Sequence, residues 1–235
     1  MSLSDEIEER VKKYLNAGYE TTRANIVPDK SSIAFGKNAK EMKAKILCID
    51  IRSSKKILSE TGAPLESCKV HKAFLYVASK CIRKENGYMR NFSGDGLIAF
   101  FMGEDGAKRA VKSAMKIKYA VNKILNPALE EREYKKLDFG IGVATGDFTV
   151  VKSGVAGDEM HQDLIWICWA TYHAVEYANK AKTPKNIWIS NNVFNEIKGD
   201  DSMRYNKGKP MWSYADEKFS FGKTKVYKTT YRWSI

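Results

Sequence analysis

A short apolar run that ends in an acid constrains this chain more than any other feature. Ile46, Leu47, Cys48 and Ile49 follow one another without a polar residue, and Asp50 comes directly after them. An uninterrupted apolar run of this length is typical of a strand that is buried on both faces. A carboxylate at the end of such a strand is costly unless it is paired or bound to a metal. The run therefore predicts an internal strand with an acid at its edge.

A second acid stands in a turn further along the chain. The segment Asn91–Gly96 reads Asn-Phe-Ser-Gly-Asp-Gly and precedes the strand-like run Leu97–Phe101. Its glycines permit positive φ, so we expect a hairpin of Tyr88–Phe92 and Gly96–Met102 with Asp95 in its turn. An aspartate in a turn is most often only a turn former. Together with the acid of the first strand, however, it gives a carboxylate pair that suits Mg²⁺ or Mn²⁺ and the oxygens of a triphosphate.

The basic composition limits the classes of partner. The chain has 40 Lys and Arg against 28 Asp and Glu, a formal charge of +12. This balance favours polyanions such as a nucleoside triphosphate, a nucleic acid or an anionic membrane. The basic residues are dispersed and no run of five occurs, so a solvated basic surface is the plainer explanation.

Length and cysteine usage set further bounds. With 235 residues and no Pro/Ser-rich linker, the chain favours one large domain. Its four cysteines show no C-x-x-C spacing, which favours buried free thiols. The chain starts with charged residues, and no apolar stretch approaches the ~20 residues that span a bilayer. We therefore expect a cytoplasmic protein.

Hydrophobic periodicity predicts a mixture of helices and strands. Helical spacing of apolar residues occurs in residues 4–17, 64–87, 106–125 and 165–180, with a short helix from Asn192. Strand-like runs occur in residues 137–145 and 148–155, which we expect to form a hairpin at Gly146-Asp147, and in residues 187–190 and 225–233. Residues 18–43 show little periodicity and read as a lead-in. This order indicates an α+β domain with a central mixed, mainly antiparallel sheet flanked by helices.

The motifs around the two acids resemble the class III nucleotidyl cyclases. The sequences Ile49–Arg52 and Ser93–Asp95 stand where that family has its two metal-binding aspartates. Three longer segments are more similar to the bacterial pyrimidine cyclases of Pycsar antiphage systems, namely Asp50–Ser54, Arg90–Asp95 and Lys225–Trp233. The resemblance spans residues 26–235.

This resemblance implies a class III cyclase fold with a ferredoxin-like core. An N-terminal helix and lead-in, residues 1–43, would precede a catalytic domain of residues 44–235. In such cyclases the residues at Asp50 and Asp95 hold two Mg²⁺ or Mn²⁺ ions per site, assisted by the carbonyl at Ile51. The ions activate the ribose 3′-hydroxyl and stay with the leaving pyrophosphate, so no protein general base is required.

Two further segments are candidates for holding phosphate. After the first acid, the loop Arg52-Ser53-Ser54 leads toward a helix, where its backbone N–H groups and the arginine could bind phosphate. Near the end of the chain, the segment from Phe221 resembles the family's basic turn, which makes Lys223 the first candidate for a triphosphate contact and Lys225 the second. An ordinary polar loop and solvated lysines are the alternatives.

The expected base contacts depart from those of purine cyclases. Purine cyclases carry a lysine four residues before the second metal aspartate, and here that place holds Asn91, with Arg90 beside it. In the stretch 163–176, the resemblance puts Tyr172 at the family's asparagine and Glu176 at its arginine. Because a glutamate cannot neutralise the charge that develops on phosphate, another residue has to stabilise the transition state. Arg52, His173 or a lysine from elsewhere are the candidates.

A homodimer with active sites between two chains is what the resemblance implies. One subunit would supply the metal acids, and the helix that we expect over residues 163–177, with Tyr172 and His173, would approach from the other. Trp166 and Trp169 lie three residues apart in that stretch, so we expect both on one helix face, in a core or subunit contact rather than stacked on a base. A packed or exposed role is the default for His173.

We therefore predict a pyrimidine nucleotide cyclase that converts UTP or CTP to the 3′,5′-cyclic monophosphate and pyrophosphate. UTP is preferred only because uridylate synthesis is the commoner activity of the group. The resemblance implies a role in antiphage defence, in which the product acts on a separate, often membrane-bound effector. We expect no direct contact with nucleic acid or membrane. A purine cyclase, a catalytically silent homologue that binds nucleotide, and a basic nucleic-acid-binding module are the alternatives.

Overall fold

The computed structural model describes residues 2–52, 64–93 and 96–235, with only the backbone for residues 91–93. The chain divides into two compact units, each built from separate stretches of sequence. Unit 1 comprises Met1–Met42 and Phe148–Ile167, and unit 2 comprises Lys43–Asp147 and Cys168–Ile235.

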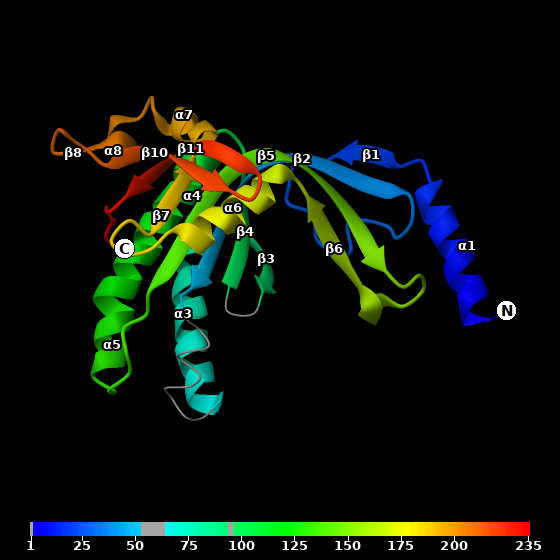
Figure 1. The fold of residues 1–235 in the computed structure, drawn as a ribbon, viewed down its shortest axis with the longest axis horizontal. Helices are drawn as coiled ribbons and strands as arrows, with labels where there is room; N and C mark the ends of the chain where they lie inside the picture. The colour runs from blue at the N-terminus through cyan, green and yellow to red at the C-terminus, as the bar shows by residue number, and fades with distance from the viewer. Residues whose placement is uncertain (1, 53–63, 94–95) are drawn as a thin grey trace. The chain divides into compact units, whose positions relative to one another are not determined.

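Unit 2 is built on a mixed sheet (Figure 1). Its strands lie in the order β10-β11-β7-β5-β2-β4-β3. Their bounds are β2 Asn38–Ile51, β3 Tyr88–Ser93, β4 Gly96–Met102, β5 Phe139–Gly154, β7 Ile187–Ser190, β10 Trp212–Phe219 and β11 Gly222–Thr229. Strand β7 runs parallel to β5, whereas β2–β4, β3–β4, β7–β11 and β10–β11 are antiparallel pairs. The predicted mixed, mainly antiparallel sheet is thus confirmed.

The helices of unit 2 lie between its strands along the chain. Their bounds are α3 Pro64–Lys84, α4 Gly106–Ala120, α5 Asn126–Glu130, α6 Trp169–Lys180, α7 Asn191–Ile197 and α8 Asp201–Arg204, and a π-helical turn over Val121–Leu125 joins α4 to α5. A short ribbon of β8 Tyr205–Asn206 and β9 Lys209–Pro210 follows α8. The succession β2-α3-β3-β4-α4-β5, with neighbours in the order β5-β2-β4-β3, is a ferredoxin-like core.

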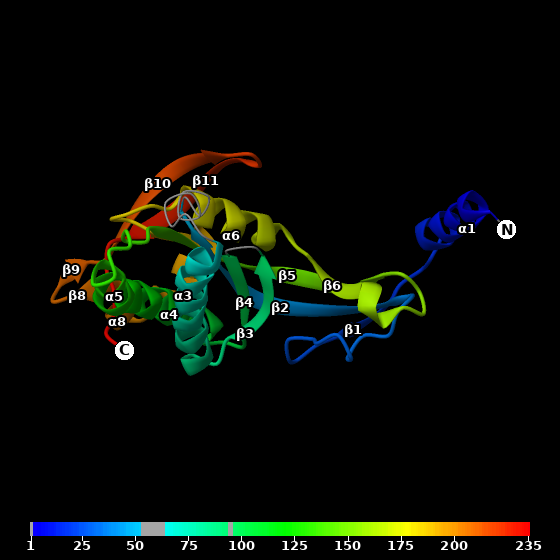
Figure 2. The same ribbon diagram turned by 90° about the horizontal axis from the view of Figure 1, so that it is seen from below.

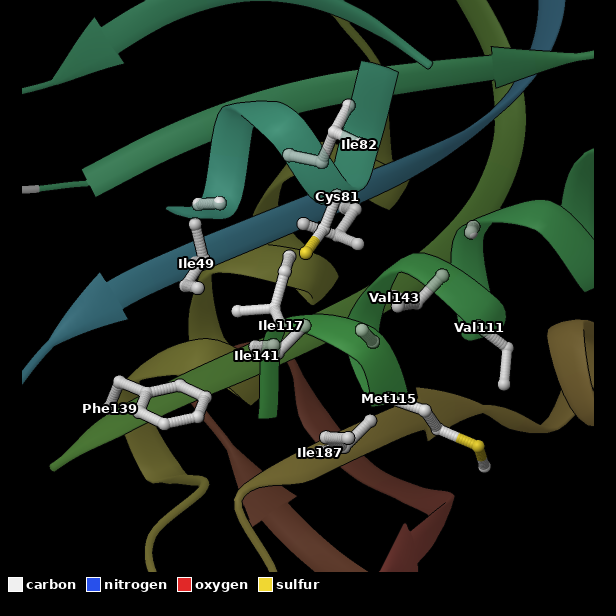
Figure 3. Packing of buried hydrophobic residues seen from close by; sticks show 14 of the residues in the cluster. Ile49, Cys81, Ile82, Val111, Met115, Ile117, Phe139, Ile141, Val143 and Ile187 are labelled. Atoms are coloured by element: carbon white, nitrogen blue, oxygen red, sulfur yellow. The ribbon is translucent and has the colours of Figure 1, made fainter. Parts of the chain in front are cut away.

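The main core of unit 2 lies between the sheet and the helices α3 and α4 (Figure 3). Ile49 of β2, Ile141 of β5 and Ile187 of β7 are fully buried in one cluster with Ile82 of α3 and Ile117 of α4. Side chains of a strand point alternately to its two faces. The strand residues directly before and after each of Ile49, Ile141 and Ile187 therefore face the other side of the sheet. Helix α6 covers that side, opposite α3 and α4 (Figure 2).

Unit 1 contains the N-terminal helix, the first residues of β2 and the last residues of β5. Helix α1, Leu3–Leu15, starts at Ser2, whose hydroxyl and backbone N–H form a capping box with Asp5. Strand β1, Glu20–Arg23, pairs in parallel with the start of β2, and β6, Gln162–Ile167, pairs antiparallel with the end of β5. Across the ranges that the structure describes, no helix is both long and apolar enough to cross a membrane.

The predicted hairpin at Gly146-Asp147 is wrong, because β5 is one continuous strand. The strand pairs with β7 through Val143 and, further on, with β6 from Thr149. Gly146 serves a close approach rather than a turn, since a Cβ built there would lie 2.6 Å from the Cys168 sulfur. In the sequence, a glycine that allows another segment to come close cannot be distinguished from a glycine that forms a turn.

The predicted helix over residues 165–180 is also wrong in its first part. Residues 162–167 form β6, with an alternating burial pattern, and the helix begins only at Trp169 with Cys168 as its N-cap. Trp166 and Trp169 therefore do not share a helix face. Further strands, β1 and the start of β2, lie within the stretch that we expected to be a lead-in.

Helix α6 packs very closely on β5, and two glycines allow it. A Cβ built on Gly142 would lie 2.0 Å from the carbonyl oxygen of Ala174, and one on Gly140 would lie 2.0 Å from that of Ala178. Both oxygens belong to helix backbone, which cannot move away as a flexible side chain can. The absence of side chains at these two positions therefore fixes the distance between helix and sheet.

We predict that Gly142→Ala lowers the free energy of unfolding by about 1–3 kcal/mol, the usual cost of overpacking a core. Chemical denaturation followed by circular dichroism measures the change. Gly199→Ala is the matched control, because nothing lies within 4 Å of a Cβ at that position. Equal stability of the two variants would show that α6 does not rest on β5 as described.

Candidate active site

The acid at the end of β2 lies where the sequence predicted it. Asp50 is half-buried, between Ile49, which is fully buried, and Ile51, which is 2% exposed. Burial raises the pKa of the neighbouring Cys48 thiol to about 12, and the charge of Asp50 adds to that rise. The strand therefore presents one carboxylate at the margin of an otherwise apolar core.

The hairpin that carries the second acid lies beside this strand end. Strand β4 pairs with β2 so that Leu97 is opposite Ile49, and Ser93 of β3 is opposite Gly96 of β4. Asp95 itself lies outside the described residues, as do Ser53 and Ser54. The described residues on either side of Asp95 nevertheless join its hairpin to the strand that ends in Asp50.

A β-bulge in β3 falls at Arg90. Met89 pairs with Ala99 and Asn91 with Ile98, so Arg90 is the extra residue between them. Bulges of this kind redirect a side chain and often occur next to active sites. The Arg90 guanidinium donates to the Met89 carbonyl oxygen at 3.1 Å and lies 5.7 Å from the centre of the Tyr88 ring. The side chain of Asn91 is not among those described.

The side chain of Arg52 anchors helix α6. Its Nε donates to the carbonyl oxygen of Ala181 at 3.1 Å, and a terminal nitrogen donates to Ala181 at 2.6 Å and also to Ala178. These carbonyls stand at the C-terminal end of α6, where the helix leaves its own acceptors unsatisfied. The backbone N–H of Arg52 donates to the Asp138 carbonyl oxygen at 2.9 Å. In this position the guanidinium ties the Asp50 strand to α6.

The two candidate lysines lie on the β10–β11 hairpin in different surroundings. Lys223 is exposed and stands directly opposite Lys218, so two positive charges face each other across the strands. Lys225 stands opposite Asp216, and its ammonium lies 4.8 Å from the centre of the Tyr214 ring. Of the two, Lys223 is the one whose charge is less well balanced by its cross-strand neighbour.

Aromatic contacts hold the tip of this hairpin on α6. The His173 ring lies 4.2 Å from that of Phe221, and the Tyr177 ring lies 5.1 Å from that of Phe219. The Ser220 hydroxyl donates to the Glu176 carboxylate at 2.7 Å. His173 and Glu176 thus fix the hairpin that carries Lys223. No local sequence pattern predicts this contact, because it joins residues that lie more than forty positions apart.

The first turn of α6 presents aromatic side chains to solvent. Trp169 is 70% exposed and Tyr172 is 61% exposed, and their rings lie 5.8 Å apart. Two large exposed aromatics side by side are unusual on a surface without a partner. We expect this end of the helix to be a contact surface.

Hard oxygen donors at the β2 end suit a magnesium or manganese ion. The half-buried Asp50 carboxylate and the carbonyl of Ile51 are the oxygen ligands that such ions take, and Asp95 on the adjoining hairpin would be the third donor. Within the described ranges, no group of three or more His, Cys, Asp or Glu side chains is placed to hold a metal.

The sequence is similar to curated uridylate cyclases along its whole length. It is 28% identical over 240 residues to the uridylate cyclase of Xanthomonas perforans and 28% identical over 239 residues to that of Burkholderia cepacia. Each alignment covers all of this chain and all of the relative. No family model matches the chain.

Solved structures of cyclases share the fold. The adenylyl cyclase CyaB from P. aeruginosa aligns with a TM-score of 0.66 at 20% identity, over 81% of this chain and 95% of its own. The guanylyl cyclase Cya2 aligns with a TM-score of 0.66 at 20% identity, over 82% and 94%. The chain therefore has the class III nucleotidyl cyclase fold. The fold and the resemblance that the motifs predicted are both confirmed.

The packing of His173 gives a pH-dependent prediction. Burial lowers the pKa of this histidine below its ordinary value of 6.5, so the folded state binds the proton less readily than the unfolded state. Stability is then lost as the pH falls through 6.5. We predict that the midpoint of urea unfolding falls more for the natural protein than for His173→Phe between pH 7.5 and 5.5. The same fall in both proteins would contradict the assignment.

Proposed function

We propose that this chain is a pyrimidine nucleotide cyclase, converting UTP, or less readily CTP, to the 3′,5′-cyclic monophosphate and pyrophosphate. The observation that carries the proposal is the full-length similarity to curated uridylate cyclases in a chain with the class III cyclase fold. The position of Asp50 at the end of β2, beside the hairpin of Asp95, supports the same chemistry.

In this proposal Asp50, Asp95 and the carbonyl of Ile51 hold two Mg²⁺ or Mn²⁺ ions per site. When bound, the ions supply Lewis-acid activation of the ribose 3′-hydroxyl and charge neutralisation on the pyrophosphate. The loop Arg52-Ser53-Ser54 would lie over the phosphates, with its backbone N–H groups as donors. The arginine would act mainly by fixing that loop, because its guanidinium is already bonded to the end of α6.

Lys223 would bind the triphosphate, with Lys225 as the second candidate. Arg90 and Asn91 would contact the base, and the bulge at Arg90 supports a directed side chain there. Tyr172 and His173 would come from the partner subunit, the histidine as a positioning residue through its contact with Phe221. The absence of a purine-reading lysine at Asn91 disfavours the adenylate and guanylate alternatives.

The Asp50 acid and the Lys223 hairpin of one chain lie at opposite ends of β7. The Arg52 N–H bonds to Asp138, next to the start of β5, where parallel β7 also begins. Lys223 lies beyond the other end of β7, because Val226 already pairs with its last residue, Ser190. From His173 to Ala181, the C-cap of α6, the eight steps along the helix span about 12 Å. This separation within one chain supports a site that takes the acid from one chain and the lysine from the other.

This arrangement supports a homodimer with two interfacial sites. The exposed Trp169 and Tyr172 on the first turn of α6 offer an apolar contact for the second subunit. We further propose that the enzyme works in the cytoplasm in antiphage defence. Its cyclic product would act on a separate, often membrane-bound effector, and the enzyme itself would contact neither nucleic acid nor membrane.

We predict that purified protein with Mn²⁺ and UTP forms cyclic UMP and pyrophosphate, and that Asp50→Asn lowers the rate at least about 100-fold because the charge that holds the metal is gone. Chromatography of the products measures both. Asp201→Asn, an exposed acid of the first turn of α8, is the control and should keep full activity. A rate unaffected by Asp50→Asn would contradict the proposed mechanism, and no product from the natural protein would favour a catalytically silent homologue.

Mixing two inactive variants tests the shared site. Asp50→Asn and Lys223→Glu should each be nearly inactive, and a mixed dimer should regain activity because one of its two sites carries neither change. Activity after mixing, compared with each variant alone, is the measurement. Lys225→Glu is the matched control and should keep more activity than Lys223→Glu. Failure to regain activity in a verified mixed dimer would place both residues in a site within one chain.

A further inference from the structure

A cleft with a basic lining opens at the C-terminal end of α6 in unit 2. It has a volume of about 480 Å³ and is bordered by the end of the helix, the loop that follows it, and strands β7, β10 and β11. The lining residues that matter here are Lys180, Lys182, Lys185, Trp188, Glu217 and Lys228. Among the described residues, neither Asp50 nor Lys223 lines it.

The positive charge of this cleft is mostly unbalanced. Its one lining glutamate, Glu217, is already paired with Lys228. Lys180 donates to the carbonyl oxygen of Lys218, and Lys185 donates to the Ser213 hydroxyl at 3.0 Å. In the part of the chain that the structure describes, no carboxylate forms an ion pair with Lys180, Lys182 or Lys185. Ammonium groups gathered around a cleft repel one another until an anion joins them.

The helix dipole explains only part of this cluster. Lys180 ends α6, where a cation is favoured by the negative end of the helix. Lys182 and Lys185 lie beyond the helix, in the loop that leads to β7, so the dipole does not account for them. Both are exposed and stand on the border of the cleft, paired with each other in a β-bridge.

The loop between α6 and β7 is held in place from three directions. The Thr183 hydroxyl donates to the Asp138 carboxylate at 2.6 Å, and the Lys118 ammonium donates to the Pro184 carbonyl oxygen at 2.6 Å. The indole N–H of Trp188 donates to the carbonyl oxygen of Lys185 at 2.8 Å. The two loop lysines therefore extend from a fixed backbone, which lowers the entropic cost of binding a ligand.

A further cation lies behind this loop. Lys118 is buried, and burial lowers its pKa to about 8, with the positive charge of Arg232 adding to the shift. Lys118 thus adds to the positive potential that the lysines on the border of the cleft produce. An anion in the cleft would also favour the charged form of Lys118.

The indole of Trp188 is not available to stack on a base. It is only 7% exposed, and the Lys228 ammonium lies 3.8 Å from the centre of its ring. A ligand in the cleft would therefore be recognised through its charge and not through an aromatic ring. Lysine ammonium groups act as point charges toward phosphate oxygens.

We propose that this cleft is a second binding site, for a compact anion with at least two linked phosphate groups. Pyrophosphate and the phosphate chain of a nucleotide share that chemistry. Lys182 and Lys185 bind the phosphates, and Lys180 and Lys228 complete the positive border. The site goes beyond the proposed cyclase reaction, since it lacks the carboxylates that hold a metal.

Hydrogen bonds connect the cleft to the strand of Asp50. The Asp138 carboxylate accepts from Thr183 in the cleft loop, and its backbone carbonyl accepts from the N–H of Arg52 at 2.9 Å. Arg52 also bonds the end of α6, next to Lys182. The proposed anion site and the strand of Asp50 are therefore connected through Asp138 and Arg52.

Isothermal titration with pyrophosphate in EDTA tests the site, because chelation removes the metal on which phosphate binding at Asp50 depends. We expect one pyrophosphate per chain, and affinity at least about tenfold weaker in Lys182→Gln/Lys185→Gln, which removes about 1.4 kcal/mol or more. Lys198→Gln/Lys209→Gln is the matched control, with the same loss of charge at exposed positions elsewhere in unit 2. Thermal unfolding checks that both variants fold.

A parallel titration with ADP separates the two sources of the anion. Equal affinity for ADP and pyrophosphate indicates recognition of the phosphates alone, and tighter binding of ADP indicates a nucleotide ligand; both support the site if the Lys182/Lys185 variant weakens them. Absence of binding of either ligand to the natural protein, or the same loss of affinity in the control variant, would overturn the proposal.

Discussion

The hydrogen bonds between Arg52 and the end of α6 connect the parts of this molecule that the chemistry needs. The guanidinium satisfies the Ala178 and Ala181 carbonyls, which the helix cannot satisfy itself. A cation at this end also opposes the negative pole of the helix. Because Arg52 comes two residues after Asp50, the same contact fixes the course of the chain beyond the acid. The helix in turn carries the hairpin of Lys223.

Close packing makes that contact possible. Gly140 and Gly142 leave no side chain between β5 and α6, so the helix backbone lies within reach of the arginine. On its other side, α6 holds the hairpin through His173 and Glu176. Strand, helix and hairpin thus form one connected support. The acid and the lysine lie at the two ends of this support, and in the proposed homodimer each active site takes one of them from each chain.

The elements with strong local patterns could be predicted from the sequence. The apolar run before Asp50 is a buried strand, and the glycines around Asp95 separate two paired strands. A glycine that interrupts a strand pattern can mark either a turn or a close approach of another segment, and the two have the same local sequence signal. Gly146 allows Cys168 to come close and does not make a turn, and nothing local distinguishes the two.

Motifs indicate candidate site residues, whereas contacts between distant segments leave no local signal. The sequence indicates Asp50 and the two hairpin lysines as candidates, but it assigns Arg52 a phosphate role and Glu176 no role. The structure places both in contacts between distant segments, at the end of α6 and at Ser220. The cleft around Lys182 and Lys185 is lined by a loop, a helix end and three strands, so no single stretch of sequence predicts it.

The most direct test of this account is the rate constant kcat/KM for each of UTP, CTP, ATP and GTP, measured with purified protein in Mn²⁺. We predict that a pyrimidine triphosphate, with UTP first, is cyclised with the highest kcat/KM and that both purines are poor substrates. A purine as the best substrate would contradict the interpretation of Asn91 and the proposed function with it.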